Sequence, residues 1–421
     1  MKSTLDVCRA CGAPHPYRFL QLGAHPPANM FVPPKDARKP QPSMELNVQA
    51  CLSCGLVQIA DQIPRGFYDH YLYVPSGADT MRAHFDQLAQ GLVGMSEGGL
   101  IVDIGSNDGL LLSHCNSRGG RTLGIDPAAN LALAARERGV DVHVGLFNPA
   151  TAAEVRKIHG PASIIVTTNT LNHIDDLADF MRATETLLSD EGTLVIETPH
   201  AQNAIGLNEF DTIYHEHLST FSLLSIQRLV ERFGMFVSDV RKLSVHGGSM
   251  RVFVRRMSVF ADRMPVQTSA VDQMIAEERQ GGMLKRATYS AFADRVAEVR
   301  ARLVAILNDL GRRKVTIAAY GASARGNTVL NYCRIGPSYL SYVADRNPLK
   351  QGLLTPGMLV PVVAPEEIER RPPDVLLILA WNFFDEIKGQ LAPYARKGGR
   401  FLLPLPEPTL IDGASVLEHA G

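Results

Sequence analysis

The residues best suited to chemistry in this chain form one short stretch, Tyr214-His215-Glu216-His217. Imidazole titrates near neutral pH, so two histidines with a carboxylate between them are suited to removing a proton or to holding a metal. The residues common in solvated turns, Gly, Pro, Asn and Asp, are missing from the stretch. If it is extended, Tyr214 and Glu216 point to one side and His215 and His217 to the other. The alternative interpretation is a pair of partly buried structural histidines.

Four of the six cysteines form two Cys-x2-Cys pairs, Cys8 with Cys11 and Cys51 with Cys54, and a glycine follows each pair. Four thiolates form the closed tetrahedral set of a structural zinc site, which has no open position for catalysis. A redox function needs only one pair and leaves the other unexplained. The sequence therefore predicts one structural zinc ion, which would also help to order the proline-rich segment 26–42.

A strand, a glycine loop and a helix are predicted from residue 100. The apolar run 100–104 is typical of a buried strand, Gly105-Ser106-Asn107-Asp108-Gly109 follows, and 110–112 begins a helix. Glycine allows close approach of a ligand, and a helix N-terminus offers free N–H groups. Neither a phosphate-binding loop nor a dinucleotide fingerprint is present. Asp103 and Asp108 would repel a pyrophosphate, but they suit the sulfonium and amino acid of S-adenosylmethionine.

An acid ends the next predicted strand. Asp126 lies 21 residues after Gly105, where a carboxylate can bind both ribose hydroxyls of an adenosine. The apolar strand 162–167 then runs into a polar loop at the edge where open α/β sheets bind ligands. This loop contains Asn169, Asn172 and His173.

Strands and helices alternate from 100 to 198, which predicts a doubly wound, mainly parallel sheet. With the glycine loop and Asp126, this pattern resembles the class I S-adenosylmethionine-dependent methyltransferases. The predicted cofactor-binding residues are Asp103, Gly105, Asn107, Asp108, Asp126, Asn169 and Asn172. The stretch 214–217 lies beyond the last strand, on the side where the methyl group would emerge, and this position favours a catalytic role for it.

The C-terminal part begins with a helical pattern from about 270 to 311, broken at Gly281-Gly282. A new strand, 314–320, meets a second glycine-rich turn that contains Ser323, Arg325 and Asn327 but no acid. Such a turn suits an anion, for example a diphosphate, at the helix N-terminus. Two later strand ends carry Asp345 with Lys350, and Trp381 with Asn382, so we expect a second site for a nucleotide or sugar phosphate. Alternatively, Trp381 fills a domain interface.

The bulk composition excludes several classes of protein. The chain has 421 residues, 45% of them hydrophobic and 20% charged, with a net charge of −1. This length predicts about two or three domains, and the absence of a basic excess argues against nucleic acid as a partner. The sequence contains no run of about 18 apolar residues, so no segment is expected to span a membrane. The N-terminus has no apolar signal core, so we expect a cytoplasmic protein.

Taken together, the motifs resemble one family, the sugar C-methyltransferases that act on nucleotide-linked 4-keto-deoxy sugars. The resemblance covers essentially the whole chain, and its motifs are Cys8-x2-Cys11, Leu22-Gly23 with Pro26-Pro27-Ala28-Asn29, Cys51-x2-Cys54-Gly55, Asp103-x-Gly105-x-Asn107-Asp108-Gly109, Tyr214-His215-Glu216-His217, Gly247-Gly248-Ser249-x-Arg251, Gly321-Ala322-Ser323-Ala324-Arg325-Gly326-Asn327 and Asp345-x-Asn347-Pro348-x-Lys350. It implies an α/β protein with three parts. These are a zinc-binding lobe over 1–70, a central class I, Rossmann-like methyltransferase domain over 71–260, and a helical linker with a C-terminal Rossmann-like domain over 261–421.

The resemblance also implies roles for single residues. His217 would be the base, with Glu216 and Tyr214 beside it. His173, Tyr71 and Tyr73 would lie near the sugar, and Tyr68 is a further candidate. The predicted substrate-binding residues are His215, Ser323, Arg325, Asn327, Asp345, Lys350, Trp381 and Asn382.

The expected substrate is a TDP-linked 4-keto sugar, methylated at C3 with S-adenosylmethionine as donor; other members of the family methylate C5. Two alternatives from other classes are an O- or N-methyltransferase on another small metabolite, and a zinc-ribbon binding module with a vestigial enzyme domain. We expect a monomer or a weak homodimer.

Overall fold

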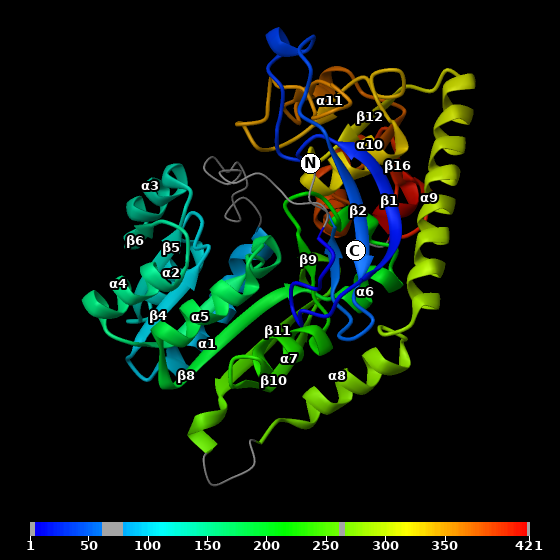
Figure 1. Cartoon of the computed structure of the whole chain (residues 1–421). Helices are drawn as coiled ribbons and strands as arrows, with labels where there is room; N and C mark the ends of the chain where they lie inside the picture. The colour runs from blue at the N-terminus through cyan, green and yellow to red at the C-terminus, as the bar shows by residue number, and fades with distance from the viewer. Residues whose placement is uncertain (1–4, 61–78, 261–265, 419–421) are drawn as a thin grey trace.

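The structure is a computed structural model that describes residues 5–60, 79–260 and 266–418. Its strands form three sheets surrounded by helices (Figure 1). The predicted boundary between residues 70 and 71 lies outside the described residues, and the boundary between 260 and 261 lies at the edge of another undescribed range.

The first sheet joins the N-terminal segment to the stretch 214–217. Its strands, in spatial order, are β1 (Tyr17–His25), β2 (Met44–Ala50), β3 (Val57–Ile59) and β9 (Ser219–Thr220). All neighbours are antiparallel, and β3 pairs with β9 through Val57 with Thr220 and Gln58 with Ser219. Because β3 follows the second cysteine pair and β9 follows His217, this pairing connects the predicted metal centre to the predicted base.

The second sheet has the strand order β10-β11-β8-β7-β4-β5-β6. Strands β4 to β8 are parallel, whereas β11 is antiparallel to both β8 and β10. The strand bounds are β4 (Leu100–Ile104), β5 (Arg121–Asp126), β6 (Val142–Val144), β7 (Ala162–Thr168), β8 (Leu188–Pro199), β10 (Met235–Leu243) and β11 (Ser249–Arg256). The predicted strands in this region are therefore confirmed.

Helices cover both faces of the second sheet, which explains why its central strands β4 and β7 are mostly apolar and buried along most of their length. Along β4, Leu100, Val102 and Ile104 enter a core formed with α4, α5 and α7, whereas Ile101 enters a core formed with α1, α2 and α3. The helix bounds are α1 (Asp79–Ser96), α2 (Leu110–Asn116), α3 (Ala129–Glu137), α4 (Pro149–His159), α5 (Leu177–Leu187), α6 (Ala201–Gly206) and α7 (Leu223–Glu231). The predicted doubly wound α/β fold is confirmed.

Two helices, α8 (Ser269–Gln280) and α9 (Arg286–Arg312), lead to the third sheet, with the predicted break at Gly281-Gly282 between them. Helix α9 buries a residue at nearly every turn, as an amphipathic helix does, and its buried side packs on β1 (Figure 1).

The third sheet has the order β14-β13-β12-β15-β16-β17, and every pair is parallel except β16 with β17. Its strands are β12 (Ile317–Tyr320), β13 (Val343–Ala344), β14 (Val362–Val363), β15 (Val375–Ile378), β16 (Arg400–Leu403) and β17 (Thr409–Asp412). Its helices are α10 (Ala324–Cys333), α11 (Glu367–Arg370), α12 (Phe384–Gln390), α13 (Ala392–Arg396) and α14 (Gly413–Glu418). The loops after β12, β13 and β15 lie at one edge, because these strands are parallel neighbours.

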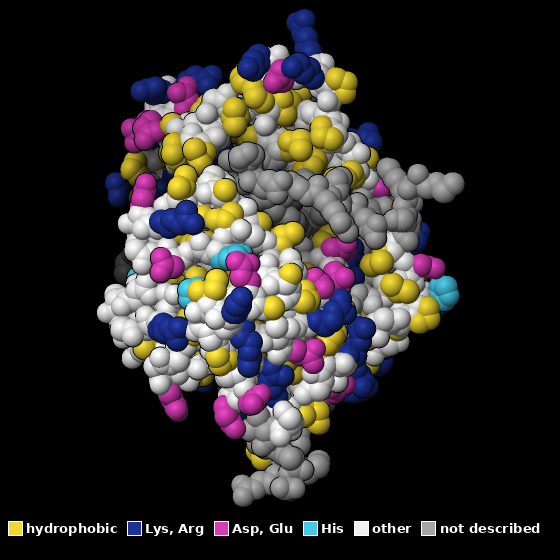
Figure 2. Space-filling view, turned by 60° about the vertical axis from the view of Figure 1, so that its left-hand side comes forward, with side chains coloured by type: hydrophobic (Ala, Val, Ile, Leu, Met, Phe, Trp, Pro, Cys, Tyr) yellow, Lys and Arg dark blue, Asp and Glu magenta, His cyan; other side chains and the backbone are white. Residues whose placement is uncertain are grey.

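Basic and acidic side chains are interspersed on the face shown in Figure 2, in agreement with the net charge of −1. Among the described residues, no helix combines the length and the apolar character needed to cross a membrane.

Candidate active site and metal centre

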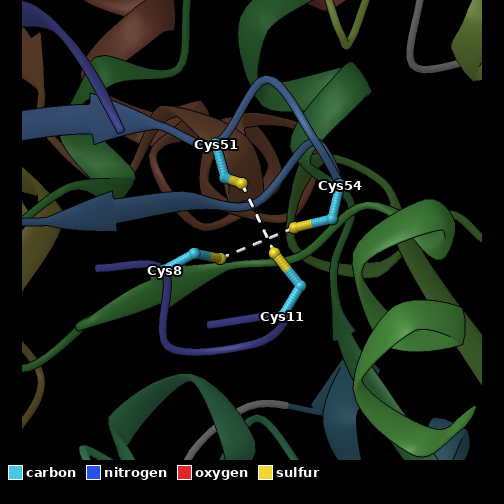
Figure 3. A group of neighbouring side chains, drawn as sticks. All are labelled: Cys8, Cys11, Cys51 and Cys54. Atoms are coloured by element: carbon cyan, nitrogen blue, oxygen red, sulfur yellow. Dashed lines mark hydrogen bonds between the residues drawn. The ribbon is translucent and has the colours of Figure 1, made fainter. Parts of the chain in front are cut away.

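The four predicted cysteine ligands lie together (Figure 3). Sγ of Cys8 is 3.6 Å from Sγ of Cys54, Sγ of Cys11 is 3.6 Å from Sγ of Cys51, and all four sulfurs lie within 4.8 Å of one another. A tetrahedral ion with Zn–S bonds of about 2.3 Å requires sulfurs roughly 3.8 Å apart. The geometry therefore fits a zinc ion held by four thiolates.

Each cysteine pair closes a tight turn that requires its glycine. The N–H of Gly12 donates to the carbonyl of Cys8, and the N–H of Gly55 donates to the carbonyl of Cys51. Both glycines have φ values near +75°, in the left-handed region that other residues rarely adopt. Hydrogen bonds from Cys54 and Cys8 lower the pKa of the Cys51 thiol, so the cluster already favours a thiolate at this position.

The stretch 214–217 is a turn, so the alternation of sides considered for an extended segment does not apply. The N–H of His217 donates to the carbonyl of Tyr214 at 2.8 Å, and the rings of these residues face each other with centroids 4.0 Å apart. The turn is largely buried and is closed by side chains of the stretch itself. It therefore needs none of the residues that favour solvated turns.

The hydrogen bonds of His217 define its tautomer. Nδ1 lies 2.7 Å from the carbonyl oxygen of Thr212, the last residue of the 3-10 helix η4 (Phe210–Thr212). A carbonyl can only accept, so Nδ1 carries the proton. Nε2 is then the basic nitrogen, and it accepts a hydrogen bond from the Tyr214 hydroxyl at 2.6 Å.

His173 lies beside His217, and the place near the sugar that the resemblance implied for it stays a prediction. Its ring centroid is 4.9 Å from that of His217, and it ends the 3-10 helix η3 (Leu171–His173). Burial lowers the pKa of His173 to about 4, although hydrogen bonds to the backbone of Glu216 and Asn169 oppose the shift. His173 is therefore neutral at pH 7, and it would not repel a proton taken up by His217.

The other two polar side chains of the stretch bind the N-terminal part of the chain. The carboxylate of Glu216 is fully buried and accepts a hydrogen bond from Nδ2 of Asn29 at 2.6 Å. His215 donates from Nε2 to the carbonyl of Met44 in β2 at 3.1 Å. The catalytic role of Glu216 and the substrate contact of His215 stay predictions. Tyr71 and Tyr73 lie outside the described residues.

Buried polar atoms without hydrogen-bond partners gather at the carboxyl edge of the second sheet. Oδ1 of Asp103, Oδ1 of Asn169 and both amide atoms of Asn172 are buried and have no partner within the described part of the chain. Gly105 has φ +78°, and a Cβ there would lie 2.2 Å from Oγ1 of Thr170. Buried donors and acceptors are normally satisfied, so this arrangement fits a polar ligand such as the amino acid of S-adenosylmethionine.

The two acids beside the glycine loop, Asp103 in β4 and Asp108 in the loop itself, differ in environment. Burial and the nearby charge of Asp126 raise the pKa of Asp103 to about 8. Asp108 instead forms an ion pair with Arg138 at 3.3 Å, so its charge is already balanced. Asp126 accepts hydrogen bonds from the N–H groups of Asn107 at 2.9 Å and Ala128 at 2.8 Å, which fix its carboxylate at the end of β5.

Arg325 and Trp381, two of the residues predicted to bind an anion, contact the segment that precedes residues 214–217. Arg325 makes a bidentate ion pair with Asp211, at 3.0 and 2.7 Å, and a further one with Glu209 at 3.1 Å. Nε1 of Trp381 also donates to Asp211 at 2.8 Å. Trp381 thus fills an interface, as the alternative interpretation held, and phosphate binding by Arg325 and Trp381 stays a prediction.

The remaining predicted substrate residues lie around this contact. The Ser323 hydroxyl accepts from the N–H of Gly326 and caps α10, and Nδ2 of Asn327 donates to the carbonyl of Ala28. Buried Lys350 donates to the carbonyl of Ala322 at 2.8 Å. Asp345 accepts from the N–H of Asn347, and Asn382 is half-buried.

Sequence reasoning missed a buried triad of Glu197, His84 and Arg251 near the end of β8. The fully buried carboxylate of Glu197 lies 2.5 Å from Nε2 of His84 and 2.9 Å from Nε of Arg251. Although burial opposes it, His84 and Arg251 lower the pKa of Glu197. The signal available in the sequence was an acid within an apolar strand, together with an arginine in a motif of the resembled family.

The fold and the two sites define an S-adenosylmethionine-dependent methyltransferase with a structural zinc centre. Three family models match successive parts of the chain: "Putative zinc binding domain" over residues 8–66, "Methyltransferase domain" over 81–238 and "C-methyltransferase C-terminal domain" over 244–406. The chain is 34% identical over 417 residues to the C-methyltransferase NovU of Streptomyces niveus, and the match covers 98% of each chain.

The chain therefore belongs to the C-methyltransferase family and is an S-adenosylmethionine-dependent C-methyltransferase. The alternatives of heteroatom methylation and of a vestigial enzyme domain are dropped. Among solved structures, the CcbJ methyltransferase from Streptomyces caelestis matches with a TM-score of 0.36 and 11% identity, over 45% of this chain and 97% of that one. Magnesium protoporphyrin IX methyltransferase from Synechocystis matches with a TM-score of 0.33 and 14% identity, over 42% and 83%.

The metal centre gives a first prediction. Cys51→Ala should lower the zinc content from about one equivalent per chain to well below half, and should lower the melting temperature, because a structural zinc ion contributes folding free energy. Elemental analysis and thermal unfolding measure both effects. Cys333→Ala, which removes a buried cysteine outside the cluster, should retain the metal. Full zinc content in Cys51→Ala would contradict the assignment.

The pKa of Asp103 gives a second prediction. With a pKa of about 8, Asp103 is mostly protonated in the empty site at pH 6–7, and a bound cation favours its carboxylate. Binding of S-adenosylmethionine should therefore release nearly one proton per chain in this range, and the release should decline as the pH rises through about 8. Calorimetry in two buffers with different ionisation enthalpies measures this number.

Asp103→Asn should abolish the proton release, whereas Asp86→Asn, at an exposed ion pair on α1, should leave it unchanged. An equal release in wild type and Asp103→Asn would show that the proton comes from another group.

Proposed function

We propose that the enzyme transfers the methyl group of S-adenosylmethionine to a carbon next to the 4-keto group of a nucleotide-linked deoxysugar. C3 of a TDP-linked sugar is the proposed position, with C5 as the alternative. The observation that supports this proposal most directly is the tautomer of His217, whose Nε2 is basic while Thr212 holds the proton on Nδ1.

A carbon acid requires a base before it can accept a methyl group. The carbon next to a ketone becomes nucleophilic only as an enolate, so its proton has to be removed close to the methyl donor. S-adenosylmethionine supplies the electrophilic methyl group when it is bound. Nε2 of His217 takes the proton in our proposal, and the neutral ring of His173 beside it adds no opposing charge.

Tyr214 offers two routes for the proton. The Tyr214 hydroxyl occupies Nε2 at 2.6 Å. In one route it turns to the substrate oxygen and leaves Nε2 to act directly on the carbon. In the other, the Tyr214 oxygen takes the α-proton while its own proton passes to Nε2. Both routes end with the proton on His217.

The loops of the third sheet are the proposed binding site of the nucleotide. They follow three parallel neighbouring strands, the usual ligand position in an open α/β sheet. Oδ1 of Asn327 in α10 is buried and has no partner within the described part of the chain, and the amino group of buried Lys350 donates to the carbonyl of Ala322 in the loop before α10. With Ser323, Arg325, Asp345, Trp381 and Asn382, these residues would hold the diphosphate and the base.

The proposal predicts the behaviour of His217→Asn. This variant should turn over TDP-linked 4-keto-6-deoxyhexose about 10²–10⁴-fold more slowly, the usual contribution of a general base, with nearly unchanged affinity for S-adenosylmethionine. It should also lose exchange of the sugar α-proton with deuterated water, followed by NMR without the methyl donor. His15→Asn is a matched control, because His15 is exposed and asparagine tolerates its positive φ of 53°.

Tyr214→Phe separates the two routes. If the proton passes through the Tyr214 oxygen, this variant should lose exchange as completely as His217→Asn, whereas direct transfer to Nε2 should leave exchange measurable. Near-normal turnover in His217→Asn would contradict the proposed base, whatever the result for Tyr214→Phe.

A further inference from the structure

A buried arginine lies between the two cysteines of the first zinc knuckle. The side chain of Arg9 is only 2% exposed. Its backbone N–H donates to Oε1 of Gln58 in β3 at 2.9 Å, and Nε2 of Gln58 returns a hydrogen bond to the carbonyl of Val7. A zinc knuckle requires only its cysteines and a tight turn, so a buried guanidinium at this position calls for a separate explanation.

The guanidinium of Arg9 bridges two segments. Nη1 donates to the carbonyl of Ile59 at 2.7 Å, and Nε donates to Oδ1 of Asp175 at 3.0 Å. Arginine suits this task, because its planar fork offers several donors in a fixed geometry.

Each of the two segments leads to one of the paired histidines. The N–H of Ile59 donates to the carbonyl of Leu218 at 3.0 Å, and Leu218 directly follows His217. Asp175 lies two residues after His173, at the end of the loop that begins with η3. One side chain therefore connects the backbone next to His217 with the loop that carries His173.

We infer that Arg9 is a positioning residue, which sets the relative placement of His173 and His217 from the zinc knuckle. This role rests on the proposed function of His217 as the base. The Asp175 side chain is 56% exposed, so its ion pair adds little to global stability. Its main effect is on the geometry of the loop, and a displacement of about 1 Å at a catalytic group can cost up to 10²-fold in rate.

The experiment compares Arg9→Met, Asp175→Ala and Asp175→Asn in the full-length, zinc-loaded enzyme. Arg9→Met keeps most of the aliphatic stem but removes the donors. Asp175→Ala removes the acceptor at a partly exposed position outside the metal centre, and Asp175→Asn retains an acceptor oxygen. Asp179→Ala is the matched control, because it removes the exposed ion pair with Arg182 in the following helix.

Turnover is measured with S-adenosylmethionine and TDP-linked 4-keto-6-deoxyhexose. We expect kcat to fall about tenfold or more in Arg9→Met and Asp175→Ala, with the KM for S-adenosylmethionine within about twofold of wild type and the zinc content unchanged. Asp175→Asn should recover most of the activity. A merely structural contact would not produce this separation of kcat from KM, nor this recovery by the conservative variant.

NMR of ¹³C-labelled histidines provides a readout that does not depend on turnover. The resonances of His173 and His217, assigned with His173→Asn and His217→Asn, should shift in Arg9→Met and Asp175→Ala but not in Asp179→Ala. Wild-type kcat or unmoved resonances in Asp175→Ala would overturn the role of Arg9. If Arg9→Met loses zinc, Asp175→Ala decides the question alone. Normal turnover in His217→Asn would instead refute the proposed base, while the resonances would still test the connection.

Discussion

One hydrogen bond, from Nδ1 of His217 to the carbonyl oxygen of Thr212, determines which imidazole nitrogen is basic. Without it, either tautomer would be possible, and Nε2 would bear the proton in part of the molecules. The carbonyl of Thr212 is fixed only because η4 is fixed. The tautomer of His217 therefore depends on how the short segment 209–220 is held, because this segment carries both Thr212 and His217.

All three sheets contribute to holding this segment. Arg325, in the first turn of α10, clamps Asp211 next to Thr212. The strand β9, just beyond His217, pairs with β3, which follows the second cysteine pair in the sequence. The loop after β7 places His173 against the His217 ring. A base positioned from three sides fits carbon methylation, in which the proton acceptor and the methyl donor have to meet at one atom.

The parts of this architecture with local signals could be predicted from the sequence. The cysteine pairs predicted the metal centre because each pair chelates an ion through residues at short spacing. The strand, glycine loop and helix from residue 100 predicted the edge of the sheet where the cofactor binds, because these elements follow one another directly in the sequence. The partners of Arg325 lie 114 and 116 residues away, and Asn29 lies 187 residues from Glu216. Only the fold brings such residues together, so the ion pairs of Arg325 could not be predicted from the sequence.

The turn at 214–217 could not be predicted for a different reason. Its residue types lack turn formers, but the hydrogen bond between Tyr214 and His217 within the turn supplies the closure that glycine or proline gives elsewhere. A pattern of residue types contains no information about a side-chain hydrogen bond inside a buried turn. The same bond, together with the carbonyl of Thr212, is what suggests a base rather than a structural histidine.

The most direct test of this account is the tautomer of His217 in the zinc-loaded enzyme, read from long-range ¹⁵N–¹H correlations of labelled histidine at pH 7. The His217 signals can be assigned by their loss in His217→Asn. The account predicts a neutral ring with the proton on Nδ1 and an unprotonated Nε2. A ring protonated on Nε2, or a fully protonated imidazolium at pH 7, would contradict it.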